Sequence, residues 1–252
     1  MNIQTTLLFI TASVNSILSL FVLFGKKDKT NIVYSIFVLF ASMWAIGLAF
    51  FILETDFARA IYIADFYYVA AVGIPVFFLY FSLIFLKKDG DISRKNQLLI
   101  ILPIVLITIF FFIDKNVIIK EVIFRDWGKD VVLNNFNYLI YTIYFLLFVA
   151  LSYFNLYKSY SSAENIEEKN QLRFVIWGTA IGFFFGMIFD LFLPFLGNYR
   201  YIFLGPLFSF SMVASIAYSI TRYHLFNVKV IATEILIFIL WIFILIRILL
   251  SG

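Results

Sequence analysis

The chain has 252 residues, of which 63% are hydrophobic and 13% charged, and its formal net charge is +4. Soluble domains are roughly one half apolar and one quarter charged, so this composition predicts a membrane protein. The sequence contains no cysteine and one histidine, which excludes disulfides, thiolate chemistry and metal sites built from several His or Cys ligands. The small positive charge is typical of loops that face an anionic leaflet, and we expect no nucleic-acid partner, no cofactor and no metal.

Eight apolar segments reach or approach the length of about 20 residues that a helix needs to cross a bilayer. The fourth is near the lower limit, and the eighth is apolar on every face, as a spanning helix is. The sequence therefore predicts an all-α, polytopic membrane helix bundle of seven helices, followed by an eighth transmembrane helix. The segments are residues 4–24, 31–53, 62–86, 98–113, 137–157, 174–197, 201–221 and 230–250.

Basic residues predict that the N-terminus lies outside. Lys26, Lys27 and Lys29 directly follow the first segment. With this orientation, twelve of the 19 basic residues fall in segments on the cytoplasmic side. Cytoplasmic loops carry such an excess of Lys and Arg, so we expect the first helix to end at the cytoplasm.

One longer loop, residues 114–136, lies outside in this orientation. Two β-rich runs flank Asp126 and Gly128, which favour turns, so a hairpin is expected there. The hairpin could serve as an outer lid or could help to capture a ligand. On the cytoplasmic side, Ser162 or Asn165 can cap the helix that leads into the sixth segment.

Two carboxylates fall inside apolar segments, where charge is costly and usually has a reason. Asp190 precedes Asn198 by about eight residues, which places it roughly 12 Å deep in the outer half of the bilayer. One interpretation is an outward-facing ligand or ion pocket that also includes nearby tyrosines. The other is that Asp65 is interfacial and that Asp190 is hydrogen-bonded within the fold. The candidate pocket residues are Asp65, Tyr67, Tyr68, Tyr138, Tyr141 and Asp190.

Prolines and rows of small or polar residues indicate how the helices are shaped and packed. Proline removes a backbone donor and kinks a helix, and small residues spaced by four let helices approach closely. The predicted kinks are at Pro75, Pro103, Pro194 and Pro206. The predicted packing rows are Ala41, Ala45 and Ala49 in the second segment and Thr11, Asn15 and Ser19 in the first.

Four stretches in the same order carry a resemblance to a known family. The first, "MWAIGLAFFILETDFARAIYIADFYYVAAVGIPVFFLYFSLIF", has a Trp in the second helix and a proline midway through the third. It is followed by "LLIILPIVL", "KNQLRFVIWG" and "YRYIFLGPLFSFSMVASIAYSITRYHLFNVKVIA". Together they resemble the seven-helix N-terminal sensor region of bacterial membrane histidine kinases over about residues 5–233. In that family a "Y-R-L-F-D-I"-like box ends the seventh helix; here His224 stands for its basic residue and Asn227 for its acidic one.

The resemblance implies a sensory input module of a two-component system in the bacterial cytoplasmic membrane. Residues 1–228 would form the sensor domain, and residues 229–252 would continue into the eighth helix and on to an output domain. The implied partners are the bilayer, a small ligand or membrane stimulus, a kinase output domain in cis or in trans, and a second copy in a homodimer.

Residues 223–234, "YHLFNVKVIATE", are interpreted as an elbow that transmits the signal. Asn227 can cap a new helix, and the lone histidine lacks the acidic neighbour of a phosphoacceptor box, so it is interpreted as structural. The elbow residues are Arg222, Tyr223, His224, Leu225, Phe226, Asn227 and Lys229.

No catalytic residues are predicted. The chain has no Walker A, GxGxxG or HExxH motif, and it contains neither a phosphoacceptor box nor an ATP-binding domain. We therefore expect an enzyme, a histidine kinase, only if a further C-terminal part exists. The alternative functions are a small-solute carrier or channel, or a membrane scaffold that senses nothing.

Overall fold

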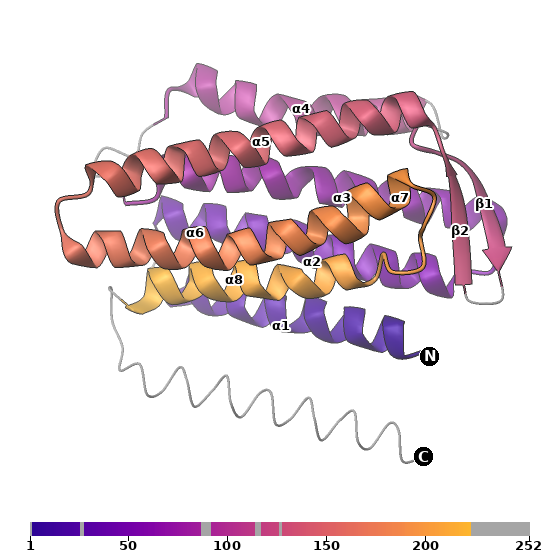
Figure 1. The fold of residues 1–252 in the computed structure, drawn as a ribbon, viewed down its shortest axis with the longest axis horizontal. Coiled ribbons are helices and arrows are strands. Elements are labelled where there is room, and N and C mark those ends of the chain that lie inside the picture. The colour runs from indigo at the N-terminus through magenta and orange to yellow at the C-terminus, as the bar shows by residue number, and fades with distance from the viewer. Residues whose placement is uncertain (1, 26–27, 87–91, 114–116, 126–127, 223–252) are drawn as a thin grey trace, which may run out of the picture.

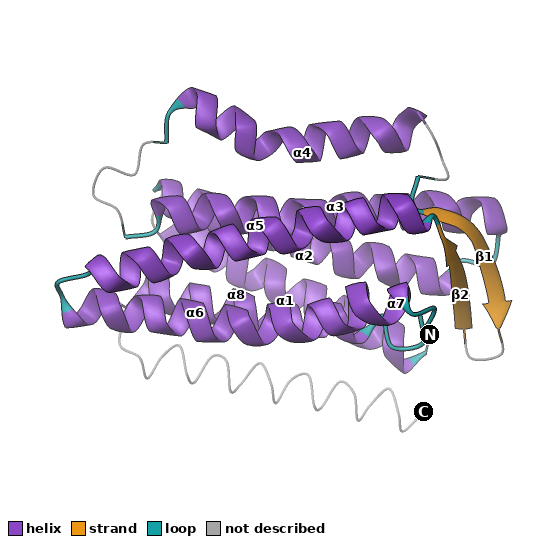
Figure 2. Ribbon diagram, turned by 45° about the horizontal axis from the view of Figure 1, so that its top comes forward, coloured by secondary structure: helices purple, strands orange, loops and turns teal. Residues whose placement is uncertain are grey.

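The computed structural model describes residues 2–25, 28–86, 92–113, 117–125 and 128–222. In this part of the chain seven long helices lie side by side, and a two-stranded antiparallel sheet lies across one end of the bundle (Figures 1 and 2). The helices are α1 (Ile3–Gly25), α2 (Lys29–Leu53), α3 (Phe57–Ile84), α4 (Arg94–Ile113), α5 (Asn135–Ser162), α6 (Ile166–Met187) and α8 (Leu204–Arg222). A π-helical turn, η1 (Ile188–Phe192), and the short α7 (Leu193–Phe195) continue α6, and the strands are β1 (Ile119–Arg125) and β2 (Gly128–Leu133).

The two ends of the bundle differ. The end that carries the sheet also carries the N-terminus and the turns before α3 and α8 (Figure 1); we call it the hairpin end. At the opposite end, which we call the far end, lie the turn before α6 and the last described residues of α8.

Six of the described helices are long and apolar enough to cross a membrane, namely α1, α2, α3, α5, α6 with its extension, and α8. Large apolar side chains such as Phe24, Phe136 and Trp177 are about two thirds exposed or more, as expected for a surface that lipid covers. The predicted all-α membrane bundle is confirmed. The predicted eighth segment, residues 230–250, lies outside the described residues.

Local sequence sets where three of the helices begin. The Asp28 carboxylate accepts a hydrogen bond from the Asn31 N–H at 2.8 Å, and Asp56 caps α3 in the same way. Asn165 accepts from the Glu167 N–H at 2.9 Å and caps α6. Of the two caps proposed for this helix, Asn165 is therefore the one used, because Ser162 is the last residue of α5.

Both predicted packing rows are buried. Ala41, Ala45 and Ala49 are fully covered, and their helix α2 packs along both α1 and α3. In the polar row of α1, the Asn15 side-chain amide donates to Oγ of Ser209 at 2.9 Å, which joins α1 to α8. Such hydrogen bonds between apolar helices fix which faces meet.

Helices α6 and α8 approach each other at two glycines. A Cβ at Gly178 would overlap the side chain of Ser215, and one at Gly182 would overlap Met212 and lie 2.8 Å from the carbonyl oxygen of Phe208. The pair can pack this closely only because these two positions have no side chain. The two helices therefore form a tightly joined unit that runs from the far end to the hairpin end.

The hairpin lies in the loop where the sequence predicted one. Its strands pair with Val122 opposite Val131, and both side chains are buried against the bundle together with Ile119 and Leu133. The opposite face of β1 is open, since Glu121 and Arg125 are exposed. Apolar residues on one face thus attach the hairpin to the bundle.

Lys129 of β2 connects the hairpin to the end of α2. Its Nζ donates to the carbonyl oxygens of Phe51 and Ile52 and lies 5.0 Å from the centre of the Phe51 ring. The last carbonyls of a helix have no partners within it and carry partial negative charge. Lys129 therefore caps α2 while holding β2 in place.

Replacing Lys129 by methionine, which has a similar length but no donor, is expected to loosen the hairpin. Hydrogen bonds from a charged group contribute roughly 1.5–3 kcal/mol each at most, so amide exchange in β1 and β2 should become at least about tenfold faster. Hydrogen–deuterium exchange by mass spectrometry measures this directly. The control is Lys120→Met on the exposed face of β1; equal exchange in the two variants would contradict the anchoring role.

The same lysine gives a pH dependence. Burial lowers the pKa of Lys129 from its ordinary 10.5 to about 8, and the nearby Glu54 carboxylate opposes part of that shift. Because the pKa of Lys129 is lower in the folded state, burying the charged amine lowers the stability of the folded hairpin. This loss of stability is fully present below pH 8 and disappears as the pH rises toward 10.5. The protection of the β1 and β2 amides from hydrogen exchange, corrected for intrinsic exchange rates, should therefore rise between pH 8 and 9.5. The rise should follow the number of protons that the folded state has lost and the unfolded state still holds. Lys129→Met should not show this rise.

Candidate functional site

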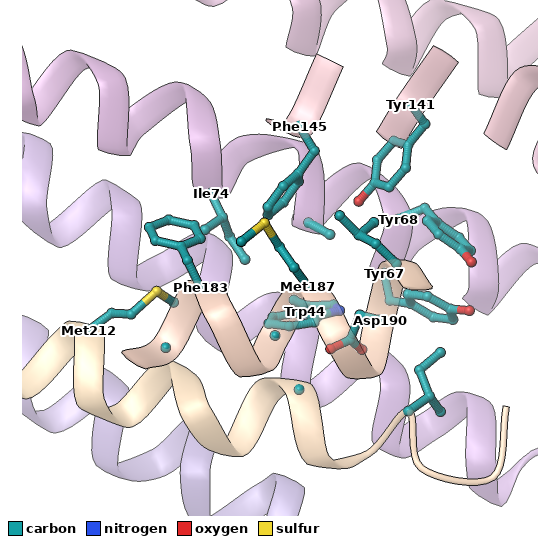
Figure 3. Close-up of a pocket in the computed structure, with 16 residues that line it drawn as sticks. Trp44, Tyr67, Tyr68, Ile74, Tyr141, Phe145, Phe183, Met187, Asp190 and Met212 are labelled. Atoms are coloured by element: carbon teal, nitrogen blue, oxygen red, sulfur yellow. The ribbon is translucent and has the colours of Figure 1, made fainter. Parts of the chain in front are cut away.

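A cavity of about 30 Å³ lies inside the bundle (Figure 3), near the start of α3 and therefore toward the hairpin end. This volume holds about two water-sized groups. The wall consists of residues from α2, α3, α5, α6, η1 and α8, and most of it is aromatic or apolar. Its aromatic members are Trp44, Tyr67, Tyr68, Tyr141, Phe145 and Phe183, and its acidic member is Asp190.

Four of the six predicted pocket residues line this cavity, namely Tyr67, Tyr68, Tyr141 and Asp190. Tyr138 lies beside them, with its ring 6.0 Å from that of Tyr141. Asp65 is 9% exposed and does not line the cavity. The structure thus groups five of the predicted residues and leaves Asp65 apart.

Asp190 lies on the π-helical turn because of the residues that follow it. Pro194 has no N–H and cannot donate to the Asp190 carbonyl, as the fourth residue along an α-helix does. The helix widens here, and the Leu193 N–H donates to the carbonyl of Ile188 five residues back. The Tyr138 hydroxyl donates to the freed Asp190 carbonyl at 2.7 Å and lies 3.2 Å from that of Leu191. Such π turns are frequent at functional sites.

The Asp190 carboxyl group is buried without a hydrogen bond. Neither of its oxygens has a donor within reach in the described part of the chain, and solvent touches neither. It packs against Gly205 in the first turn of α8, where a Cβ would overlap Oδ2 and lie 2.7 Å from Oδ1. A buried carboxylate needs a cation or hydrogen-bond donors, so Asp190 stays a candidate for contact with a ligand.

Tyrosine side chains surround the acid. The ring of Tyr68 lies 4.6 Å from that of Tyr67 and contacts Tyr141 edge-on at 5.6 Å. The Tyr68 hydroxyl lies near those of Tyr67 and Tyr199, but these three make no hydrogen bond of ordinary geometry with another described group. The site therefore combines a cluster of tyrosine hydroxyls with a carboxyl group that makes no hydrogen bond.

Replacing Tyr138 by phenylalanine is expected to destabilise the protein by about 1–3 kcal/mol, because the freed carbonyls beside Pro194 lose their donor. Denaturant-induced unfolding of the purified protein in mixed micelles measures the change. Tyr157→Phe, an exposed tyrosine of the same helix, is the matched control. Equal midpoints for the two variants would show that the Tyr138 hydroxyl does not support the π turn.

The remaining predicted site residues are placed as follows. Pro75 and Pro103 lie inside α3 and α4, which continue through them. Pro206 lies in the first turn of α8, where an N–H has no partner within the helix, so it marks a helix start. Arg222 is the last residue of α8. The other elbow residues, Tyr223 to Lys229, lie outside the described part of the chain.

The sequence analysis missed the other three aromatic members of the cavity wall, Trp44, Phe145 and Phe183. It also missed the glycine contacts, although Gly178, Gly182 and Gly186 are spaced by four, a pattern that the sequence displays openly. Gly182 and Gly186 line the cavity. The row of glycines along which α6 packs against α8 therefore also forms part of the site.

Fold and site together define a multi-pass membrane protein with seven long helices and an interior acid at one end. The family model for the N-terminal 7TM region of histidine kinase matches residues 7–229, and the chain belongs to this family. The resemblance found in the sequence is thereby confirmed. The matched family is the sensor region of such kinases. No curated protein matches the chain.

Proposed function

We propose that the chain is the transmembrane sensory input module of a bacterial two-component histidine kinase. Its N-terminus and hairpin face the outside of the cytoplasmic membrane, and the stimulus acts in the outer half of the bundle, at the cavity around Asp190. Residues 1–228 form the sensor domain, and residues 229–252 lead to the output. The module acts as a homodimer on a kinase output domain in cis or in trans.

The observation that carries the proposal is the contact between Asp190 and Gly205. It joins the one acidic group of the cavity wall to the first turn of α8. A stimulus that draws the carboxyl group into the cavity, or pushes it out, changes the space at that turn. The first turn of α8 then has two positions, and the stimulus favours one of them. Such a difference in affinity between two states is what a switch requires.

The packing of α6 with α8 supports a route to the far end. Gly178 and Gly182 bring the helices together over their middle, and the Ser219 hydroxyl donates to the carbonyl of Gln171 at 3.2 Å near the far end. A displacement at the start of α8 is therefore carried along the pair to Arg222. From there the signal leaves through the elbow of residues 223–234.

A carrier or channel is less well supported. A second cavity, of about 170 Å³ and lined by Asp28, Gln171 and Ser219 among others, lies at the far end. Between the two cavities the rings of Phe78, Phe183 and Tyr153 contact one another, with Phe78 and Phe183 4.8 Å apart. A solute would have to part this aromatic layer.

The proposal is tested by joining residues 1–234, which contain the whole elbow, to the cytoplasmic catalytic region of a known bacterial histidine kinase. Asp190→Asn and Gly205→Ala are expected to change reporter output by about fivefold or more in either direction, since allosteric coupling is typically 1–3 kcal/mol. Asp65→Asn, which removes a buried charge outside the cavity wall, is the matched control.

Membrane levels of each chimera are measured by immunoblot, so that loss of protein is not read as loss of signal. If output stays the same in both site variants while the protein is present, the cavity does not control the kinase. If Asp65→Asn has the same effect as Asp190→Asn, the response reflects charge removal in general.

A further inference from the structure

We propose that the cavity at Asp190 binds the ammonium group of a small amine, and that such amines are the class of ligand that the module detects. The detection step rests on the proposed function, whereas the binding step stands on the geometry of the cavity and can be measured separately.

Charge is the first argument. The wall contains a carboxyl group with two unbonded, solvent-free oxygens, and it contains neither Lys nor Arg. An ionised Asp190 is therefore unpaired among the described residues of the wall. A guest that carries one positive charge and several N–H donors supplies both the missing charge and the missing hydrogen bonds.

The aromatic wall is the second argument. Trp44, Tyr67 and Tyr68 are each at most 8% exposed and line the same cavity as the carboxyl group; Figure 3 shows Asp190 among them. The faces of aromatic rings attract cations, and desolvated rings do so most strongly.

Metal ions fit this wall poorly. Calcium and magnesium take six or more oxygen ligands, and the wall offers one carboxyl group and the hydroxyls of Tyr67, Tyr68 and Tyr141. In the described part of the chain, no group of three or more His, Cys, Asp or Glu residues could hold a metal. An organic cation, in contrast, can also pack its carbon atoms against the apolar side chains of the wall.

Cavity size restricts the class further. A volume of about 30 Å³ corresponds to about two water-sized groups, which suits ammonium or methylammonium. Tetramethylammonium is too large to enter without displacing the wall. The site therefore differs from the wide aromatic cages that hold quaternary ammonium groups.

The test uses the full chain in lipid nanodiscs and isothermal titration calorimetry at constant ionic strength. Methylammonium chloride is the probe, and sodium chloride and tetramethylammonium chloride are the comparison salts. We expect saturable binding of methylammonium alone. Asp190→Asn should weaken it at least about tenfold, and Asp65→Asn should leave it unchanged.

A second pair of variants keeps the test valid if Asp190→Asn fails to fold. Trp44→Leu should weaken methylammonium binding several-fold, and Trp44→Phe, which restores a ring, should recover most of it. Absence of saturable binding in the folded wild-type chain overturns the proposal, as does equal binding in Asp190→Asn. Equal binding of sodium shows a site for any small cation and also overturns it.

The two proposals fail in different ways. If the kinase chimera responds to Asp190→Asn but the chain binds no amine, the ligand class is wrong and the sensory role stands. If methylammonium binds through Asp190 but no site variant alters the chimera, the site stands and the sensory role is wrong.

Discussion

Replacing Gly205 by alanine is expected to displace the Asp190 carboxyl group and to destabilise the bundle by about 1–3 kcal/mol, the usual cost of an overpacked core. The added Cβ would overlap Oδ2 of Asp190. The carboxyl group can turn only into the small cavity, or else the first turn of α8 must move away. Thermal or denaturant unfolding of the purified chain measures the loss of stability.

Two further variants make this prediction specific. Gly186→Ala places a methyl group where nothing lies within 4 Å, so it should be neutral or stabilise the helix by about 0.5–1 kcal/mol. In an Asp190→Ala background the Gly205→Ala step should cost much less, because the overlapping atoms are gone. If the cost is the same in both backgrounds, the contact between Asp190 and Gly205 is not its cause.

Replacing Gly182 by alanine is expected to have an effect at least as large, about 2–3 kcal/mol. The new Cβ would overlap Met212 and lie 2.8 Å from the carbonyl oxygen of Phe208. Met212 can bend, but the backbone carbonyl cannot move without α8. Helices α6 and α8 must therefore separate along their middle, which also widens the cavity.

Unfolding in mixed micelles measures the cost, and cross-linking measures the separation. The chain has no cysteine, so cysteines introduced in pairs on α6 and α8 report only on this interface. Met212→Ala should restore part of the stability of Gly182→Ala. Unchanged cross-linking and stability in Gly182→Ala would show that the helices are not held together at this glycine.

The order of the seven long helices in the described part of the chain could be predicted because spanning length is a local property of the sequence. Which aromatic side chains line the cavity could not be predicted in the same way. Helices that are apolar on every face do not reveal which face points inward. Nothing in the sequence therefore indicates that Trp44 and Phe183 line the cavity.

Lys129 shows a second limit of sequence reasoning. In the sequence it lies in the predicted outside loop, residues 114–136, directly before the acidic Asp130. In the structure Asp130 instead pairs with Arg125 at 3.5 Å, and Lys129 is buried against the end of α2. A long-range contact between a hairpin and a helix end depends on tertiary packing, which neighbouring residues do not encode.

The π turn has a consequence for the evolution of the family. A π turn holds one more residue than an α turn, so η1 can be regarded as a single-residue insertion that α6 has accommodated. Relatives that lack Pro194 and are shorter by one residue between Gly186 and that position should have an uninterrupted sixth helix. In them every side chain beyond the deletion would be turned by about 100° around the helix axis. A residue at the position of Asp190 would then point away from the cavity. We therefore expect such relatives to lack an acid at this depth.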